Sequence, residues 1–458
     1  MATSTTIKVD SQQTFAAQKA DDLLSGPIVS VMLKLAFPTL CVLVIQTLIG
    51  VIETYFVSSL GAHVLAGVSV VFPVLMLMQM MANGGIGNGL ASAIARAYGA
   101  QKWELARSLV WHGIILAGII GVFFALILII LGPTLYKSMG VSEEALSAAL
   151  SYSNIVFISS PLIWLVAMLS AALRGAGDTR TPALITLLGA LILLPLSPAL
   201  IFGWGVIPAQ GVAGAGLAIV IYYVITALFL TRHLISDKSV IKASISPPNL
   251  KSFKDILGVG LLASLGTVQL NLTVAIVTAA VGYFGADAVA GYGIASRLEY
   301  IQIPLLFGLG TAIITMVGVN IGAGQVERAR KITWIGALIA FTFTTIIGLI
   351  VAIYPNLWLT IFTDDENVLN FGANYLQKVA PLYGFISAGL IIYFAGIGMK
   401  RVFWPVLAGT VRMIIAAIIG WISVFYFNSD LPLLFNIIVI SILAYFLISI
   451  TSMRVIFR

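Results

Sequence analysis

Two glutamates, Glu53 and Glu299, lie inside long apolar stretches, whereas the other acidic residues fall in loops, in the N-terminal tail or at the ends of such stretches. A carboxylate at the centre of a bilayer costs roughly 2.5–3.5 kcal/mol even on lenient insertion scales, so it normally faces a bundle interior or a water-filled cavity. Burial also disfavours the charged form of a carboxyl group, which lets a proton or Na⁺ compete for it. Such residues are typical of ion-coupled transport.

Three residues share a helical face with Glu53, because Thr39, Gln46 and Gly50 precede it by fourteen, seven and three positions. A polar stripe with a glycine notch faces protein or water rather than lipid. We therefore expect Glu53 and Gln46 to belong to a cation-coupling site. A purely structural hydrogen bond of Glu53 is the alternative.

The second acid, Glu299, has Gln302 on its own face and Arg297 on a different face. One interpretation is a second coupling acid or a substrate-recognition acid. The other is a structural ion pair with Arg297 or with Arg412, both of which lie in apolar surroundings.

A weaker polar stripe lies on a neighbouring apolar stretch, where Ser264, Thr267, Asn271 and Thr278 follow helical spacing. Thr267 and Asn271 could line a cavity, or the stripe could form hydrogen bonds between helices. The glycine-rich segment 84–89 follows no strand and contains no lysine, so close helix packing or local unwinding is expected there rather than phosphate binding.

Apolar stretches of the length that spans a bilayer fill the chain. Hydrophobic residues are 60% of it and charged residues 9%, which excludes a soluble globular protein. We expect an all-α polytopic membrane protein with twelve spans, near 34–58, 64–90, 108–132, 151–172, 182–203, 211–231, 255–281, 288–318, 332–354, 373–396, 404–427 and 432–453.

The connecting segments alternate in charge. Lysine and arginine gather in every second connection, for example around 232–254 and 328–331, and acids such as 364–366 lie in the others. Because Lys/Arg bias sets orientation, both termini should be cytoplasmic. The net charge of +7 is therefore a topology signal and does not indicate nucleic-acid binding.

An internal repeat divides the chain into two halves. Segment 59–67 resembles 283–291, 99–107 resembles 322–330, and a third echo pairs Gly175 and Gly177 with Gly396 and Gly398. Halves with an even number of spans are related by a pseudo-two-fold axis along the membrane normal. The expected organisation is a cytoplasmic tail (1–30), an N-lobe (31–232), a cytoplasmic linker (233–254) and a C-lobe (255–458).

At these residues the chain resembles the multidrug and toxic compound extrusion (MATE) family. The resemblance rests on Glu53 lying eight residues before Gly61 in a Gly-x-x-x-x-Ala-Gly element, and on segments 173–178, 211–216 and 319–324. It implies two six-helix lobes in a V shape, outward efflux of bulky cationic or amphipathic compounds, and coupling to inward H⁺ or Na⁺.

The resemblance also bears on the fifth span and on Pro38 in the first span. Many prokaryotic relatives carry a second acid on the fifth span with an asparagine four residues before it, where this chain has Ser197 and Leu193. A lone carboxylate suits H⁺, although Na⁺ at Glu53 stays possible if hydroxyls such as Ser197 supply ligands. Pro38 could be the hinge that a proline in the first helix of the family provides, or it could simply start that helix.

The expected function is secondary active multidrug efflux by alternating access, in antiport with H⁺ or Na⁺. The alternatives are a flippase for lipid-linked saccharides and, as minor ones, a channel or a membrane enzyme. No catalytic cluster, cofactor motif or nucleotide-binding motif is apparent, so we expect no enzyme activity and no cofactor. The expected partners are small organic substrates and the lipid bilayer of a bacterial or archaeal inner membrane, with the chain as a monomer.

Overall fold

The computed structural model describes residues 20–457 and is all-helical within them, apart from one isolated bridge between Trp204 and Ile207. Apolar segments must satisfy their backbone groups internally in lipid, and the α-helix does so. Eleven helices are long and apolar enough to span a membrane, and the number becomes twelve when one bent pair counts as a single span. The all-α polytopic architecture is confirmed.

The first half of the chain forms a bundle that we call the N-lobe. Its helices are α2 (Ile28–Ser58), α3 (Ala62–Met80), α4 (Gly87–Gly99), α5 (Trp103–Ser138), α6 (Glu143–Ile158), α7 (Ser160–Gly175), α8 (Arg180–Phe202) and α9 (Val212–Ile235). A π-helical turn, Met81–Ile86, joins α3 to α4. The bent pair consists of α6 and α7, which meet at Ser159 with an angle of 48°.

The second half forms the C-lobe. Its helices are α10 (Leu250–Gly282), α11 (Ala286–Gly322), α12 (Val326–Ile353), α13 (Asn356–Leu359), α14 (Glu366–Val379), α15 (Tyr383–Gly398), α16 (Phe403–Met413), α17 (Gly420–Phe427) and α18 (Leu431–Ile456). A 3₁₀ turn, Ala380–Leu382, joins α14 to α15, and a second π-helical turn, Ile414–Ile419, joins α16 to α17.

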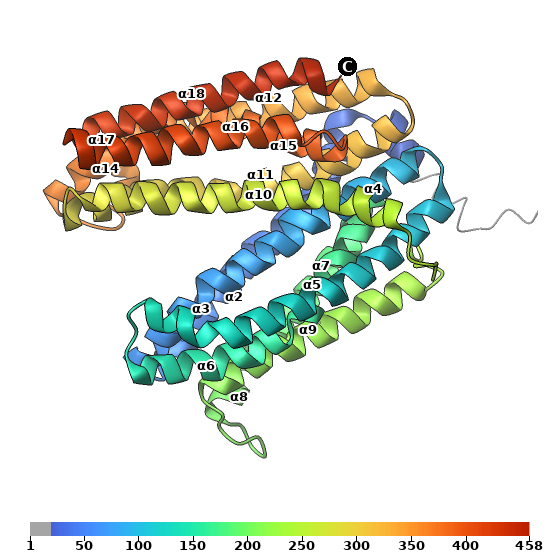
Figure 1. Cartoon of the computed structure of the whole chain (residues 1–458), viewed down its shortest axis with the longest axis horizontal. Helices are drawn as coiled ribbons and strands as arrows, with labels where there is room; N and C mark the ends of the chain where they lie inside the picture. The colour runs from blue at the N-terminus through green and yellow to red at the C-terminus, as the bar shows by residue number, and fades with distance from the viewer. Residues whose placement is uncertain (1–19, 458) are drawn as a thin grey trace, which may run out of the picture.

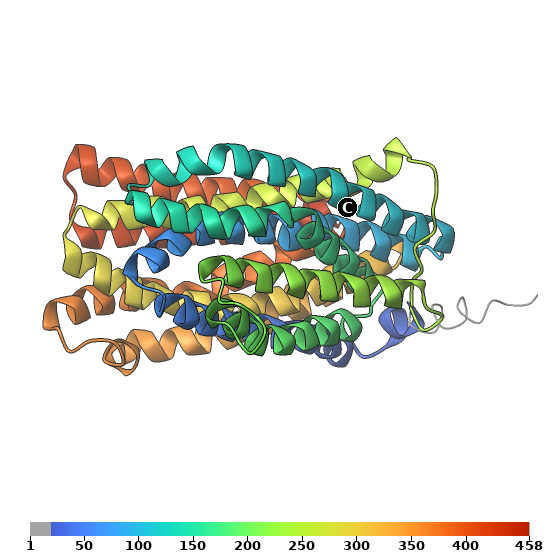
Figure 2. The same ribbon diagram turned by 90° about the horizontal axis from the view of Figure 1, so that it is seen from below.

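The long helices run roughly lengthwise in both views (Figures 1 and 2), and the two lobes diverge as a V in Figure 1. The lobes meet at the end that carries the basic connections, near α4 and the C-terminus, and separate toward the acidic connections near α6 and α14 (Figure 1). Close contact at the meeting end comes from α4, which packs on both α10 and α11.

Glycines in equivalent positions confirm the repeat. A Cβ at Gly67 would collide with Ala145 O on α6, and a Cβ at Gly291 would collide with Val368 O on α14. The third echo needs a correction of register. A Cβ at Gly175 would collide with Ala91 O, and a Cβ at Gly398 would collide with Ile314 O. Gly398 therefore corresponds to Gly175 and not to Gly177.

The glycine-rich segment 84–89 behaves as expected, because it runs from the π-helical turn into the start of α4 and packs closely on α10. A Cβ on Gly85 would collide with the Ser264 side chain, and one on Gly89 would collide with Ile256 O. Local unwinding here lets the second span of the N-lobe approach the C-lobe backbone.

The connection between the lobes, residues 236–249, is docked on the N-lobe. Asn249 N donates to His112 Nε2 at 2.8 Å, Ser244 N donates to Arg107 O at 3.3 Å, and the hydroxyls of Ser108 and Ser246 are 2.8 Å apart. These hydrogen bonds therefore hold the linker against the N-lobe where the lobes meet.

Candidate functional site

The N-lobe site centres on Glu53, in the last third of α2. Its Oε1 is buried and has no hydrogen-bond partner among residues 20–457. Three tyrosines lie within electrostatic range of the carboxyl group: Tyr152 on α6, and Tyr222 and Tyr223 on α9. Glu53 therefore faces the interior of the N-lobe bundle rather than lipid, as the polar stripe predicts.

Polar neighbours extend this site, although they do not touch Glu53 itself. Gln46 lies in hydrogen-bonding range of Tyr222, and Gln79 Nε2 donates to the Tyr223 hydroxyl at 3.1 Å. Ser197 is buried on α8, a helix that packs on α2, and its Oγ has no hydrogen-bond partner in the described part of the chain. Gln46 is joined to the Glu53 surroundings through Tyr222, whereas the Ser197 hydroxyl forms no hydrogen bond with any described residue.

Pro38 lies well inside α2, ten residues after its first residue, Ile28. The alternative that Pro38 starts the helix is therefore wrong; Pro27 precedes the helix instead. An interior proline removes the backbone hydrogen bond to the carbonyl four residues earlier, here that of Lys34, and weakens the helix there.

The C-lobe site centres on Glu299 in α11, one of the most deeply buried spans. Tyr375 on α14 donates its hydroxyl to Glu299 Oε1 at 2.5 Å, and the Tyr292 ring packs edge-on against Tyr375 at 5.1 Å. Arg412 lies within electrostatic range of Glu299, but the two form no ion pair within 4.0 Å. The expected structural ion pair is thus replaced by a hydrogen bond from a tyrosine.

A cavity of about 140 Å³ adjoins this acid. Of the residues expected at a substrate site, four line it: Glu299, Gln302, Thr267 and Arg412. Asn271 does not; it is exposed, and its Nδ2 donates to Thr267 O at 2.9 Å and contacts Met80 Sδ at 3.8 Å across the lobe boundary.

Arg297 also lies outside the cavity, which corrects the expectation that it belongs with Glu299. Its side chain is exposed and its guanidinium stands over the Phe362 ring at 6.0 Å. Two residues along a helix correspond to a turn of about 200°, so Arg297 and Glu299 point to different sides of α11.

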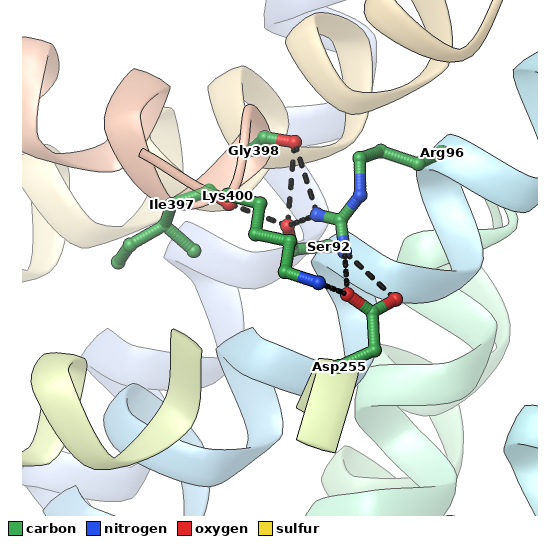
Figure 3. Close-up of polar contacts among 6 residues, drawn as sticks. All are labelled: Ser92, Arg96, Asp255, Ile397, Gly398 and Lys400. Atoms are coloured by element: carbon green, nitrogen blue, oxygen red, sulfur yellow. Dashed lines mark hydrogen bonds and ion pairs between the residues drawn. The ribbon is translucent and has the colours of Figure 1, made fainter. Parts of the chain in front are cut away.

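The sequence did not predict a charged cluster where the lobes meet, because Asp255 lies at the end of a predicted span, where acidic residues are common. Asp255 on α10 accepts two hydrogen bonds of 3.0 Å from Arg96 on α4, and Lys400 Nζ approaches it at 2.5 Å. Figure 3 shows both cations pointing to Asp255, with Ser92 between Arg96 and the carbonyls of Ile397 and Gly398. Arg96, a lone cation near the end of an apolar stretch, was the signal available in the sequence.

Lys400 has a backbone φ of 63°, in the left-handed region, where the equivalent residue of the N-lobe is Gly177 with φ 82°. A residue with a side chain costs roughly 1–2 kcal/mol in that conformation. The ion pair with Asp255 offsets part of this cost and gives the lysine side chain a role that glycine cannot fill.

The structure thus has two lobes with equivalent contacts, an isolated intramembrane acid in each lobe and a charged contact between the lobes at one end. These features are typical of a transporter. The family model described as MatE matches residues 38–199 and 257–422, one segment in each lobe. This chain belongs to the MatE family. The V-shaped MATE architecture expected from the resemblance is confirmed, and the family consists of membrane transporters.

Curated relatives cover most of the chain. A protein named "FAD transporter" from Shewanella oneidensis is 28% identical over 81% of this chain and 82% of its own. The "Probable multidrug resistance protein NorM" of Thermotoga maritima is 28% identical over 88% of this chain and 91% of its own. A crystal structure of a MATE protein in a bent conformation superposes with a TM-score of 0.88 at 25% identity, covering 95% and 97% of the two chains.

No group of three or more His, Cys, Asp or Glu side chains that could hold a metal ion exists within residues 20–457.

Proposed function

We propose that this MATE protein is a secondary active efflux transporter of a bacterial or archaeal plasma membrane, and that it exchanges amphipathic organic compounds for H⁺. The observation that carries the proposal is the Glu53 carboxyl group, which is buried in the N-lobe among tyrosines with one oxygen unpartnered in the described chain. A group so placed exchanges a proton with little rearrangement of its own surroundings.

The choice of H⁺ over Na⁺ follows from the ligands near Glu53. Hard cations take several oxygen ligands, usually with more than one carboxylate. Ser197 stands where many relatives carry another acid and Leu193 where they carry an asparagine, so the site offers a single negative charge.

Alternating access is supported by the distribution of contacts between the lobes. Hydrogen bonds and ion pairs cross from one lobe to the other at the basic end, through Ser92, Arg96 and Thr315, and the lobes diverge at the acidic end (Figure 1). Breaking the polar contacts while closing the open end would expose the same interior to the other side of the membrane.

Pro38 is the proposed hinge of this movement. The missing backbone hydrogen bond makes α2 easier to bend between its cytoplasmic half and Glu53. Pro38→Ala restores the donor and should slow transport several-fold without weakening substrate binding. Pro73→Ala, in the interior of α3, is the control; equal effects of the two would argue against a special role of Pro38.

The flippase alternative receives less support. A lipid-linked saccharide carries phosphates, which need several cations, and Arg412 is the one basic residue that lines the cavity. Substrate class is not decided by similarity, because relatives of equal identity are named for FAD and for multidrug resistance.

The test is transport of ethidium into proteoliposomes with everted protein. An imposed ΔpH with an acidic lumen should drive accumulation, and an imposed ΔNa⁺ without ΔpH should not. Glu53→Gln should abolish ΔpH-driven accumulation, because the amide keeps the shape but exchanges no proton, and Glu53→Asp should keep part of it. Glu144→Gln, an exposed acid on α6, is the matched control. Transport by Glu53→Gln at the wild-type rate would refute the coupling role.

A further inference from the structure

The cavity of about 140 Å³ in the C-lobe is lined by a cation, Arg412, whose side chain forms no hydrogen bond or ion pair with residues 20–457. We propose that this cavity is a recognition subsite for the anionic end of an aromatic substrate, with Arg412 binding its carboxylate or phosphate. The inference rests on the proposed transport function and adds a substrate class to it.

The first observation is the state of Arg412 itself. Its Nε is buried without an acceptor, and no hydrogen bond or ion pair links its guanidinium to residues 20–457. Its guanidinium carbon lies over the Tyr445 ring, 5.8 Å from the ring centroid. A guanidinium stays charged and has five donors, so a buried one with open donors is costly unless an anion reaches it.

The second observation is that the nearest acid is already engaged. Glu299 accepts the hydroxyl of Tyr375 on the α14 side of the site, and it lies farther than 4.0 Å from the Arg412 nitrogens. Both side chains line the same cavity. A planar anion can enter there and meet the guanidinium in the two-pronged geometry that carboxylates and phosphates share.

The third observation concerns the other walls. Gln269 donates its Nε2 to Thr410 Oγ1 at 2.7 Å, which leaves its Oε1 as a buried acceptor without a donor, and the Tyr383 hydroxyl is also unpartnered among the described residues. Both residues line the cavity. They suit a substrate that carries an N–H or O–H donor besides its anionic group.

Size and lining define the rest of the substrate. Phe307, Phe394 and Tyr393 add aromatic rings to the walls, and such rings favour an aromatic guest. A volume of about 140 Å³ is close to that of an apolar cavity of roughly 150 Å³ that holds one benzene ring. Because Met80 and Gly84 of the N-lobe complete the lining, a larger compound can extend from here into the space between the lobes.

The experiment measures binding rather than transport. Purified protein in nanodiscs is titrated with 2-naphthoate, its neutral analogue 2-naphthamide and the cation 2-naphthylmethylammonium, with fluorescence as the readout and empty nanodiscs as the blank. Wild-type protein should bind the carboxylate at least tenfold more tightly than the amide, and the ammonium compound most weakly.

Variants test whether Arg412 causes the preference for the carboxylate. Arg412→Gln should lose the tenfold preference for the carboxylate and leave binding of the amide unchanged, whereas Arg412→Lys should keep part of it. Arg297→Gln, the exposed arginine of the same lobe, should bind all three probes like wild type. Glu299→Gln should tighten carboxylate binding several-fold, because it removes a like charge from the site.

Equal binding of carboxylate and amide by the wild-type protein would overturn the proposal, even if Arg412→Gln failed to fold. It would also be overturned if Arg412→Gln kept the preference. If Arg412→Gln lost stability and adding Glu299→Gln restored it with no change in probe ranking, the two residues would be a structural pair. Transport by Glu53→Gln would refute H⁺ coupling and leave this binding result unaffected, so the two proposals fail separately.

Discussion

Ser92 and Thr315 make the same contact from opposite lobes. Ser92 Oγ on α4 donates to Ile397 O near the end of α15, and Thr315 Oγ1 on α11 donates to Arg174 O near the end of α7, at 2.9 Å. Donors and acceptors are both 223 positions apart (315 − 92 and 397 − 174). Each hydroxyl thus adds a donor from the other lobe to a carbonyl at a helix C-terminus, which also accepts from the backbone N of Gly177 or Lys400 three residues further on.

The ion cluster beside Ser92 has no such counterpart, since Val319 and Gly177 stand at the positions equivalent to Arg96 and Lys400. Asp255→Asn removes the shared anion and should favour separation of the lobes at this end. The pairs are partly exposed, so a loss of about 1–2 kcal/mol, or about 5–30-fold in the population ratio, is expected. Pulsed electron paramagnetic resonance between spin labels at positions 102 and 331 measures the ratio.

Glu104→Gln is the control for this measurement, because Glu104 pairs at 3.1 Å with Arg107 on its own helix and spans no lobe boundary. An unchanged distance distribution in Asp255→Asn would show that the cluster does not hold the lobes together.

Gly67 and Gly291 should be equally intolerant of a side chain. A methyl group at either position collides with the backbone of α6 or α14, and overpacking of this kind costs about 1–3 kcal/mol. Gly67→Ala and Gly291→Ala should each lower the thermal unfolding midpoint of the purified protein. Gly118→Ala on α5 faces open space and should leave the midpoint unchanged or raise it. Matching midpoints for all three variants would contradict the assigned helix contacts.

His112 should hold the linker. It is fully buried, Nδ1 lies 2.7 Å from Ser108 O, and Nε2 accepts from Asn249 N. In this arrangement Nδ1 is the donor to Ser108 O and Nε2 is the acceptor. His112→Ala should release segment 236–249 and raise the rate of trypsin cleavage at its lysines about tenfold, measured on purified protein. His63→Ala changes an exposed histidine in the first turn of α3, and this variant should be cleaved at the wild-type rate. The opposite ranking would refute linker docking.

Both termini should be cytoplasmic, as the basic connections predict. In a Cys41→Ala background, a cysteine at position 364 should react with an impermeant maleimide added to whole cells, and one at position 242 should react only after the cells are opened. Labelling of position 242 alone in whole cells would show that the topology is the reverse of the predicted one.

The spans, the two lobes and the isolation of Glu53 and Glu299 followed from the amino-acid sequence. In lipid a hydrophobic segment has to be helical, and an acid within it stands out against its neighbours. The alternation of basic and acidic connections then predicted the orientation of the spans. Glycine motifs located the repeat, because backbone contacts as close as those of Gly67 and Gly291 permit no side chain.

The neighbours of those acids were decided by tertiary structure. A span that is apolar on nearly every face carries little information about its rotation, so the sequence left Arg297 and Arg412 as equal candidates to pair with Glu299. Packing of α11 turned Arg297 toward Phe362, placed the Tyr375 hydroxyl on Glu299 and left Arg412 lining the cavity. Arg96 and Asp255, 159 positions apart, meet only because α4 packs on α10 across the lobe boundary, and no local pattern encodes such a contact.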